Sequence, residues 1–262
     1  MNTNSLGLFN ALADILNGDR QSGDYAIAYS LISHANDLSS VSITDIMAEA
    51  YVTRSAVRRF CNRIGFMNFS ELKEQMTPVA YPSDLNHRDR SVPLETYRSD
   101  LDARMLAMFS EMRRTIDNDA IARLAQRLHD CSNVLMTCAN NTSGIIGRFQ
   151  QELFYAGKVV QLVDMTYHER LAELAAADDG MLVVVSASGV FAKSVCTWVD
   201  GATADKVLIT AAPDVADWRG YDAVYCLSDR PCPYDALGLY GKYGISYFFD
   251  LLSACYLNMF AQ

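Results

Sequence analysis

Four arginines lie close together in an otherwise acidic chain. Arg54, Arg58, Arg59 and Arg63 fall within ten residues that contain no acid, whereas the 262-residue chain has 31 acidic and 22 basic residues and a formal charge of −9. Guanidinium groups bind phosphates and the edges of bases, so this segment has the chemistry for contact with a nucleic acid. The negative net charge argues against indiscriminate binding of nucleic acids, but it is compatible with one basic face on the protein.

The arginine segment has the spacing of an amphipathic helix. At 100° per residue, one side is apolar and carries Val57, Phe60, Cys61 and Ile64. The other side carries the arginines and short polar residues. Thr53 is placed to cap the helix, where free backbone N–H groups also favour an anion. The alternative is a solvated face whose arginines pair with acids elsewhere, but no acid lies three or four residues away within the helix.

A helix-turn-helix over about residues 42–64 would present this face to DNA. The residues "SITDIMAEA" are expected to form its first helix, and "YVT" forms the break before the second, which enters the major groove in such motifs. The predicted DNA-binding residues are Thr53, Arg54, Ser55, Arg58, Arg59, Asn62 and Arg63. Arg54, Ser55 and Arg58 are expected to reach base edges. Arg59 and Arg63 are expected to reach phosphates, with an internal acid as the alternative for Arg59.

The remaining elements divide the chain into two domains. Residues 1–76 have helical apolar spacing and predict an all-α DNA-binding domain. Residues 77–93 hold three of the six prolines and are read as a linker. Residues 94–262 begin with two helical patterns, after which short β-rich apolar runs alternate with helices. This alternation predicts an α/β domain with a mostly parallel sheet covered by helices on both faces.

A longer pattern around the arginines resembles a known family. "T-x-x-A-V-x-R-F-C-x-R-I-G-F-x-N-F-x-E-L-K", from Thr53 to Lys73, is similar to the recognition segment of RpiR/MurR-type bacterial transcription regulators. Those proteins have "S-x-x-T-V-x-R-F-x-x-x-L-G-F-x-G-F-x-E-L-K" there. The departures are Ala56 for Thr, Asn68 for Gly, and Tyr51 for the glycine of the turn. A positive φ would be costly at Tyr51, whereas Asn68 tolerates it.

The resemblance implies that the second domain is a sugar-isomerase (SIS) domain that binds a phosphosugar through two loops. Both loops would follow strands, where an open parallel sheet also places its ligands. The implied ligand-binding residues are Asn140, Asn141, Thr142 and Ser143 in "CANNTSG", and Ser186, Ser188 and Gly189 in "SASG". Ala139 and Asn141 replace glycines of the family pattern, and Phe191 replaces a threonine that would bind phosphate.

Two other functions remain open at this level. One is a sugar-phosphate isomerase with an accessory helical domain, for which His168 and Glu169 could serve as acid and base. The other is a regulator whose SIS domain only dimerises. The departures at the two loops and the absence of a placed acid–base pair argue against the isomerase.

The composition and the apolar patterns of the sequence predict a cytoplasmic protein. No signal peptide is evident, the apolar stretches are too short to span a membrane, and seven scattered cysteines fit reduced thiols. The four histidines have no metal-ligand spacing. We therefore expect a non-enzymatic regulator without cofactor or metal. It would act as a homodimer or a dimer of dimers on operator DNA, with a phosphosugar or related anionic metabolite as effector.

Overall fold

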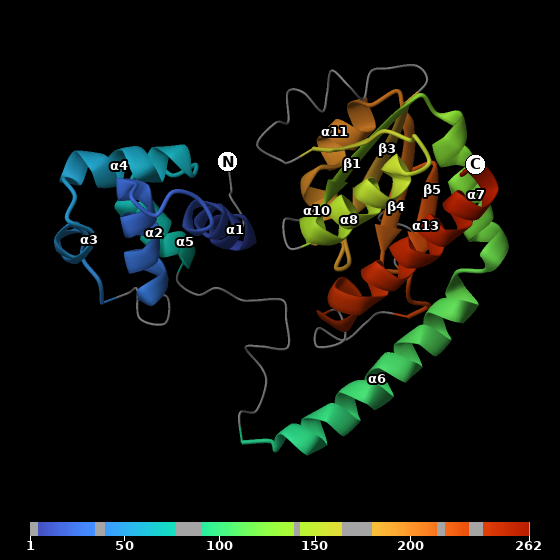
Figure 1. The fold of residues 1–262 in the computed structure, drawn as a ribbon, viewed down its shortest axis with the longest axis horizontal. Helices are drawn as coiled ribbons and strands as arrows, with labels where there is room; N and C mark the ends of the chain where they lie inside the picture. The colour runs from blue at the N-terminus through green and yellow to red at the C-terminus, as the bar shows by residue number, and fades with distance from the viewer. Residues whose placement is uncertain are drawn as a thin grey trace. The chain divides into compact units, whose positions relative to one another are not determined.

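The computed structural model describes residues 5–34, 40–76, 91–138, 142–163, 180–213, 218–230 and 238–261. The chain divides into two compact units, Met1–Tyr81 and Pro82–Gln262, which are drawn in Figure 1. Most of the predicted linker, 77–90, lies outside the described residues.

The first unit is a small helical domain. Its helices are α1 (Ser5–Leu16), α2 (Gly23–Ser33), α3 (Ile43–Ala50), α4 (Arg54–Arg63) and α5 (Phe69–Met76). Ser22 caps α2, and Ser42 forms a reciprocal capping box with Asp45 at the start of α3. Apolar residues of all five helices form its core, among them Leu12, Leu31, Ile46, Phe60 and Leu72. The predicted helix-turn-helix corresponds to α3 and α4.

Two residues with positive φ shape the turns around α4. Tyr51 has φ 53° and ψ 42°, and its N–H donates to the carbonyl of Met47 at the end of α3. Gly65, with φ 91°, ends α4, and the next N–H, that of Phe66, donates to Cys61 O at 2.8 Å. This bond lets the buried Phe66 fold back onto the core, as in a glycine-terminated helix.

The second unit is built on a five-stranded sheet that is parallel throughout its described strands. The strands are β1 (Asn133–Cys138), β2 (Val160–Leu162), β3 (Gly180–Val185), β4 (Asp205–Thr210) and β5 (Ala223–Cys226). Their order is β2-β1-β3-β4-β5, so β2 and β5 are the edges. β1 and β3 are paired from Asn133–Gly180 to Cys138–Val185, and their carboxyl ends therefore lie together.

Helices cover both faces of the sheet. One face packs against α6 (Leu94–Thr115), α7 (Asn118–Asp130), α8 (Ser143–Phe154), the π-helical turn η4 (Tyr240–Gly244) and α13 (Ile245–Phe260). The other packs against α10 (Val190–Ser194) and α11 (Cys196–Gly201). Consecutive β3 residues alternate between the two cores, as a strand buried on both faces requires. The expected fold class is confirmed. Residues 164–179, between β2 and β3, lie outside the described residues.

Candidate nucleic-acid interface and effector loops

Helix α4 presents a polar face away from its core. Val57, Phe60 and Cys61 are almost fully buried and anchor the helix in the first unit. The side chains predicted to meet DNA are all exposed: Thr53, Arg54, Ser55, Arg58, Arg59, Asn62 and Arg63. The helical wheel therefore gives the correct orientation of the helix.

The four arginines differ in their ionic partners. Arg63 forms an ion pair with Asp24 of α2, while its side chain remains 56% exposed. Within the described part of the chain, Arg54, Arg58 and Arg59 form no ion pair with an acid. Three guanidinium groups are thus presented together near the start and middle of α4. Because they lie on one exposed face, they can meet phosphates or bases without first giving up a carboxylate.

The polar residues of α4 also have structural roles. Thr53 caps the helix by accepting from Ala56 N at 3.3 Å, and its hydroxyl lies 2.9 Å from Ser55 Oγ. With its amide nitrogen turned toward the following loop, Asn62 donates to Phe66 O at 3.0 Å and Met67 O at 3.1 Å. The Asn62 amide is therefore already engaged within the protein.

Helix α3 is held against α2 by polar contacts. Glu49 accepts a hydrogen bond from Ser30 Oγ at 2.6 Å and lies 2.8 Å from His34 Nε2. The hydrogen bonds from Ser30 and His34 lower the pKa of the Glu49 carboxyl, which keeps it charged and acceptor-only. These contacts set the position of the helix that precedes the turn. Tyr51 in that turn is 95% exposed, beside the start of α4.

The loop after β1 is described in part. Asn140 and Asn141 lie outside the described residues, as does Ala139. Thr142 is 4% exposed, and Ser143 is exposed and begins α8. Their hydroxyls and the start of a twelve-residue helix lie at the carboxyl end of β1, where backbone N–H groups favour an anion.

The loop after β3 is close to that after β1, because the two strands are neighbours. Ser186 is buried, and its Oγ accepts from Ala192 N at 3.2 Å. Ser188 is half-buried and accepts a long contact, 3.4 Å, from Val190 N. Both oxygens accept from the backbone, so their hydroxyl protons are the groups available to donate to a ligand.

Trp218 covers this second loop, a feature that the sequence did not reveal. Gly189 has φ 77°, and a Cβ there would lie 2.8 Å from the indole of Trp218. The indole is positioned by a 3.0 Å hydrogen bond from its Nε1 to Ala212 O. Phe191 packs against the same apolar cluster as Trp218, so the residue that replaces threonine serves the core. A single tryptophan in a short segment forms no periodic pattern, so its position over Gly189 could not be predicted from the sequence.

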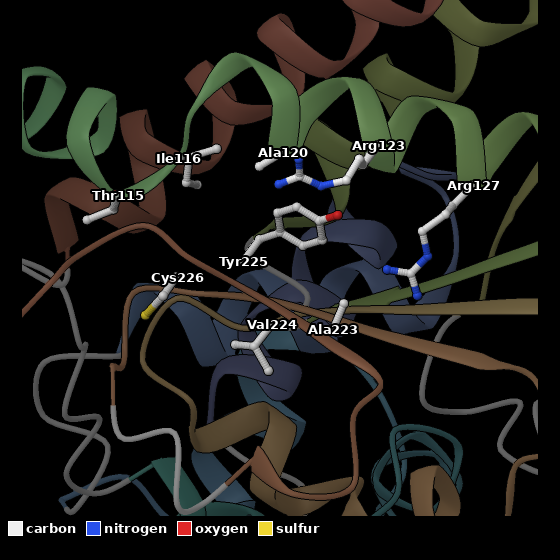
Figure 2. Close-up of a pocket in the computed structure, with 9 residues that line it drawn as sticks. All are labelled: Thr115, Ile116, Ala120, Arg123, Arg127, Ala223, Val224, Tyr225 and Cys226. Carbon is white, nitrogen blue, oxygen red and sulfur yellow. The ribbon is translucent and has the colours of Figure 1, made fainter.

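A hollow of about 310 Å³ lies elsewhere in the second unit, between α7 and the edge strand β5. Figure 2 shows the Tyr225 ring pointing from the strand toward α7, with Arg123 and Arg127 on the helix beside it. Arg127 Nε donates to Asp205 Oδ2 at 2.9 Å. Burial raises the pKa of the Tyr225 hydroxyl, an effect that Arg127 opposes. This hollow is distinct from the loops after β1 and β3.

The described residues provide no metal cluster. Among them, no group of three or more His, Cys, Asp or Glu could hold a metal ion. His129 Nδ1 lies 3.2 Å from Tyr256 Oη, and its ring stacks on Phe260, so it belongs to packing. His168 and Glu169 lie outside the described residues. No helix in the described ranges is both long and apolar enough to cross a membrane.

Comparison with known proteins identifies the kind of domain that the first unit forms. Residues 20–79 match the model of the helix-turn-helix domain of the rpiR family. No curated protein sequence matches the chain.

Two solved structures share the fold. The NanR protein of Vibrio vulnificus, solved in complex with ManNAc-6P, is 17% identical with a TM-score of 0.53, over 97% of this chain and 92% of that chain. The sugar isomerase domain of an RpiR transcription factor from Sphaerobacter thermophilus is 13% identical with a TM-score of 0.51, over 62% of this chain and 90% of that one. The chain thus joins a helix-turn-helix domain of the rpiR family to an α/β unit with the fold of a sugar isomerase (SIS) domain.

Proposed function

We propose that this protein is a transcription regulator that binds operator DNA through α4 and senses a phosphorylated sugar through the loops after β1 and β3. The observation that carries the proposal is the exposed face of α4, where Arg54, Arg58 and Arg59 lack acidic partners within the described residues. This face lies on the second helix of a helix-turn-helix, the helix that enters the major groove.

The residues of α4 are proposed to divide their roles by position. Arg54, Ser55 and Arg58, near the helix N-terminus, reach base edges, whereas Arg59 reaches a phosphate. Arg63 must share its guanidinium with Asp24, so its contribution to phosphate binding is smaller than that of Arg59. Thr53 orients the start of the helix through its cap.

Arginine substitutions test the DNA-binding role. The probes are a duplex selected by the wild-type protein from a random library and a scrambled duplex of equal length. Replacing a base-reading arginine, Arg58→Ala, should cost about 1–3 kcal/mol on the selected duplex and relax its specificity. Arg59→Ala should weaken both duplexes and reduce the salt slope of binding by about 1. Fluorescence anisotropy across a salt series measures both effects.

Arg113→Ala on the exposed face of α6 is the control, since it removes the same charge from the other unit. If both α4 variants bind the two duplexes with wild-type affinity, α4 is not part of the DNA interface.

The effector loops support a sugar phosphate as ligand. Ser186, Ser188, Thr142 and Ser143 bring four hydroxyls and a helix start to the carboxyl ends of adjacent strands. Because the fold-related NanR protein was solved with ManNAc-6P, that compound is the first probe, followed by other hexose 6-phosphates and inorganic phosphate. At 100 times its dissociation constant a ligand should stabilise the protein by about 2.7 kcal/mol.

Ser188→Ala should abolish this stabilisation, because its hydroxyl makes only a long contact in the protein and can turn to a ligand. Ser194→Ala is the matched control, since Ser194 Oγ donates to Phe191 O within α10. Thermal unfolding monitored by fluorescence gives the readout. If none of the probes shifts the transition, the SIS unit only supports assembly. Turnover between aldose and ketose phosphates by the purified protein would instead favour the isomerase.

A further inference from the structure

Tyr51 is an exposed aromatic residue in the turn that leads into α4. It is 95% exposed, more than any other large apolar or aromatic residue in the described part of the chain. Within the same residues its hydroxyl forms no hydrogen bond and its ring contacts no other ring. The side chain therefore contributes little to the packing of the first unit.

The backbone of the turn does not require a tyrosine either. The N–H groups of Tyr51 and Val52 both donate to the carbonyl of Met47, and Val52 then packs against the core. This return needs the left-handed conformation of residue 51, which glycine adopts freely and asparagine tolerates. Neither the turn nor the core explains the tyrosine, and strained residues of this kind are concentrated at functional sites.

The ring stands beside the proposed DNA-binding face. Thr53, Arg54 and Ser55 follow it directly and are all exposed, and only Val52 between them turns inward. Arg54 has no acidic partner within the described ranges. Tyr51 therefore extends the exposed start of α4 toward α3.

The turn of a helix-turn-helix has a defined place on DNA. The first helix crosses the sugar–phosphate backbone, and the N-terminal residues of the second helix reach base edges in the major groove. The turn between them therefore lies where the groove meets the backbone. A side chain at this rim meets phosphate oxygens, which accept hydrogen bonds from tyrosine hydroxyls as well as from arginine.

We propose that Tyr51 is a further DNA-contact residue, whose hydroxyl donates to a backbone phosphate at the rim of the groove. The inference rests on the proposed function, since it requires α4 to enter the groove. The contact positions the start of α4 and reads no base. A phenol carries no charge near pH 7, so the contact does not add to the salt dependence that the arginines produce.

The first test removes only the hydroxyl. Tyr51→Phe keeps the ring and the backbone conformation, and it should weaken binding to the selected and the scrambled duplex alike, by about fivefold to tenfold. The slope of log affinity against log salt should stay at the wild-type value, whereas Arg59→Ala should reduce it by about 1. Fluorescence anisotropy on the full chain across a salt series gives both quantities.

The second test separates DNA contact from folding. Tyr51→Gly and Tyr51→Asn relieve the backbone strain, so the midpoint of urea unfolding should not fall. Both variants lose the hydroxyl and the ring, so their affinity for both duplexes should fall about tenfold. A purely structural role predicts the opposite, since a relaxed turn would leave the affinity unchanged or raise it. Tyr29→Ala, at a 60% exposed tyrosine of α2, is the matched control and should bind as wild type does.

The third test locates the phosphate. Ethylation of one phosphate of the selected duplex removes its charge and obstructs its acceptor oxygens. At the phosphate that Tyr51 contacts, ethylation should weaken the wild-type protein but cause less further loss in Tyr51→Phe, because interacting groups are not additive. Phosphates contacted by Arg59 should show the same interference in both proteins.

Wild-type affinity of Tyr51→Phe would overturn the proposal. A loss confined to the selected duplex would overturn the assignment to a phosphate, and so would identical ethylation patterns for wild type and Tyr51→Phe. If Arg58→Ala and Arg59→Ala lose affinity while the Tyr51 variants do not, only the Tyr51 contact is wrong. Unchanged binding by the arginine variants would instead contradict the proposed function itself.

Discussion

Tyr51 holds a backbone conformation that tyrosine does not favour. At the turn between α3 and α4 it adopts φ 53° and ψ 42°, the left-handed region in which non-glycine residues bear a cost of about 1–2 kcal/mol. Its side chain is 95% exposed and contributes little packing in return. Capping and the buried faces of α3 and α4 must therefore hold the turn in place.

Replacing Tyr51 with glycine should stabilise the first unit. Relief of the strain exceeds the extra entropy of glycine in the unfolded chain, so Tyr51→Gly should raise the free energy of unfolding by about 0.5–1 kcal/mol. Tyr51→Ala keeps a Cβ and serves as the control, with no such gain. Urea unfolding gives the free energy of unfolding of both variants. Equal values for the two would mean that the backbone at Tyr51 is not strained.

At the scale of elements, α6 is tied to the segment after β5 through a buried carboxylate. Glu111 is 6% exposed and accepts from Ser228 Oγ at 2.5 Å and Asp229 N at 3.1 Å, with Arg230 Nη2 at 3.4 Å. Burial raises the pKa of Glu111, but hydrogen bonds from Ser228, Asp229, Tyr240 and Arg230 outweigh it and lower the pKa to about 2. Figure 1 shows the N-terminal half of α6 extending away from the sheet, so these contacts anchor its other half.

Glu111→Gln should therefore destabilise the second unit in a pH-dependent way. Because the folded pKa lies below the ordinary 4.5, the charged form stabilises the fold above about pH 4.5, and this contribution is lost as pH falls toward 2. At pH 7 we expect a loss of about 2–3 kcal/mol, shrinking as the pH is lowered to 3.

Guanidinium unfolding at pH 7 and pH 3 measures the difference between wild type and Glu111→Gln. Glu95→Gln, at an exposed position of the same helix, should show no comparable loss. A pH-independent deficit in Glu111→Gln would mean that shape, rather than charge, matters there.

On the scale of the whole molecule, the two units have separate cores. Residues from α1 to α5 form one apolar cluster, and the clusters of the second unit contain none of them. The first unit can therefore fold by itself, and a two-fold dimer of the second unit would act as a tether that presents two α4 helices to one operator. Tethering raises the effective concentration of the second helix once the first has bound.

A fragment of residues 1–81 should accordingly keep its helices and bind the selected duplex at least 100-fold more weakly than the full chain, since it lacks the tether. Circular dichroism checks that the fragment folds, and anisotropy measures its affinity. Equal affinities for fragment and full chain would show that the second unit does not pair the DNA-binding helices.

Local patterns in the sequence determined much of this protein. The helical wheel oriented α4 correctly, with Val57 and Phe60 inside and Arg54 and Arg58 outside, because a period of 3.6 residues decides which side chains share a face. The strands from β1 to β5 could be identified because short apolar runs that alternate with helical segments are typical of parallel strands buried on both faces. Asn140 and Asn141 remain predictions.

Contacts between distant residues were decided only by the tertiary structure. Asp24 pairs with Arg63, the indole of Trp218 covers Gly189, and Ser228 binds Glu111 across 117 residues. No spacing rule links such positions, since the partners meet only after the helices and strands have packed. For the same reason, only the folded molecule distinguishes the paired Arg63 from the other three arginines of α4. Those three, Arg54, Arg58 and Arg59, form no ion pair among the described residues and are the best candidates for contacting DNA.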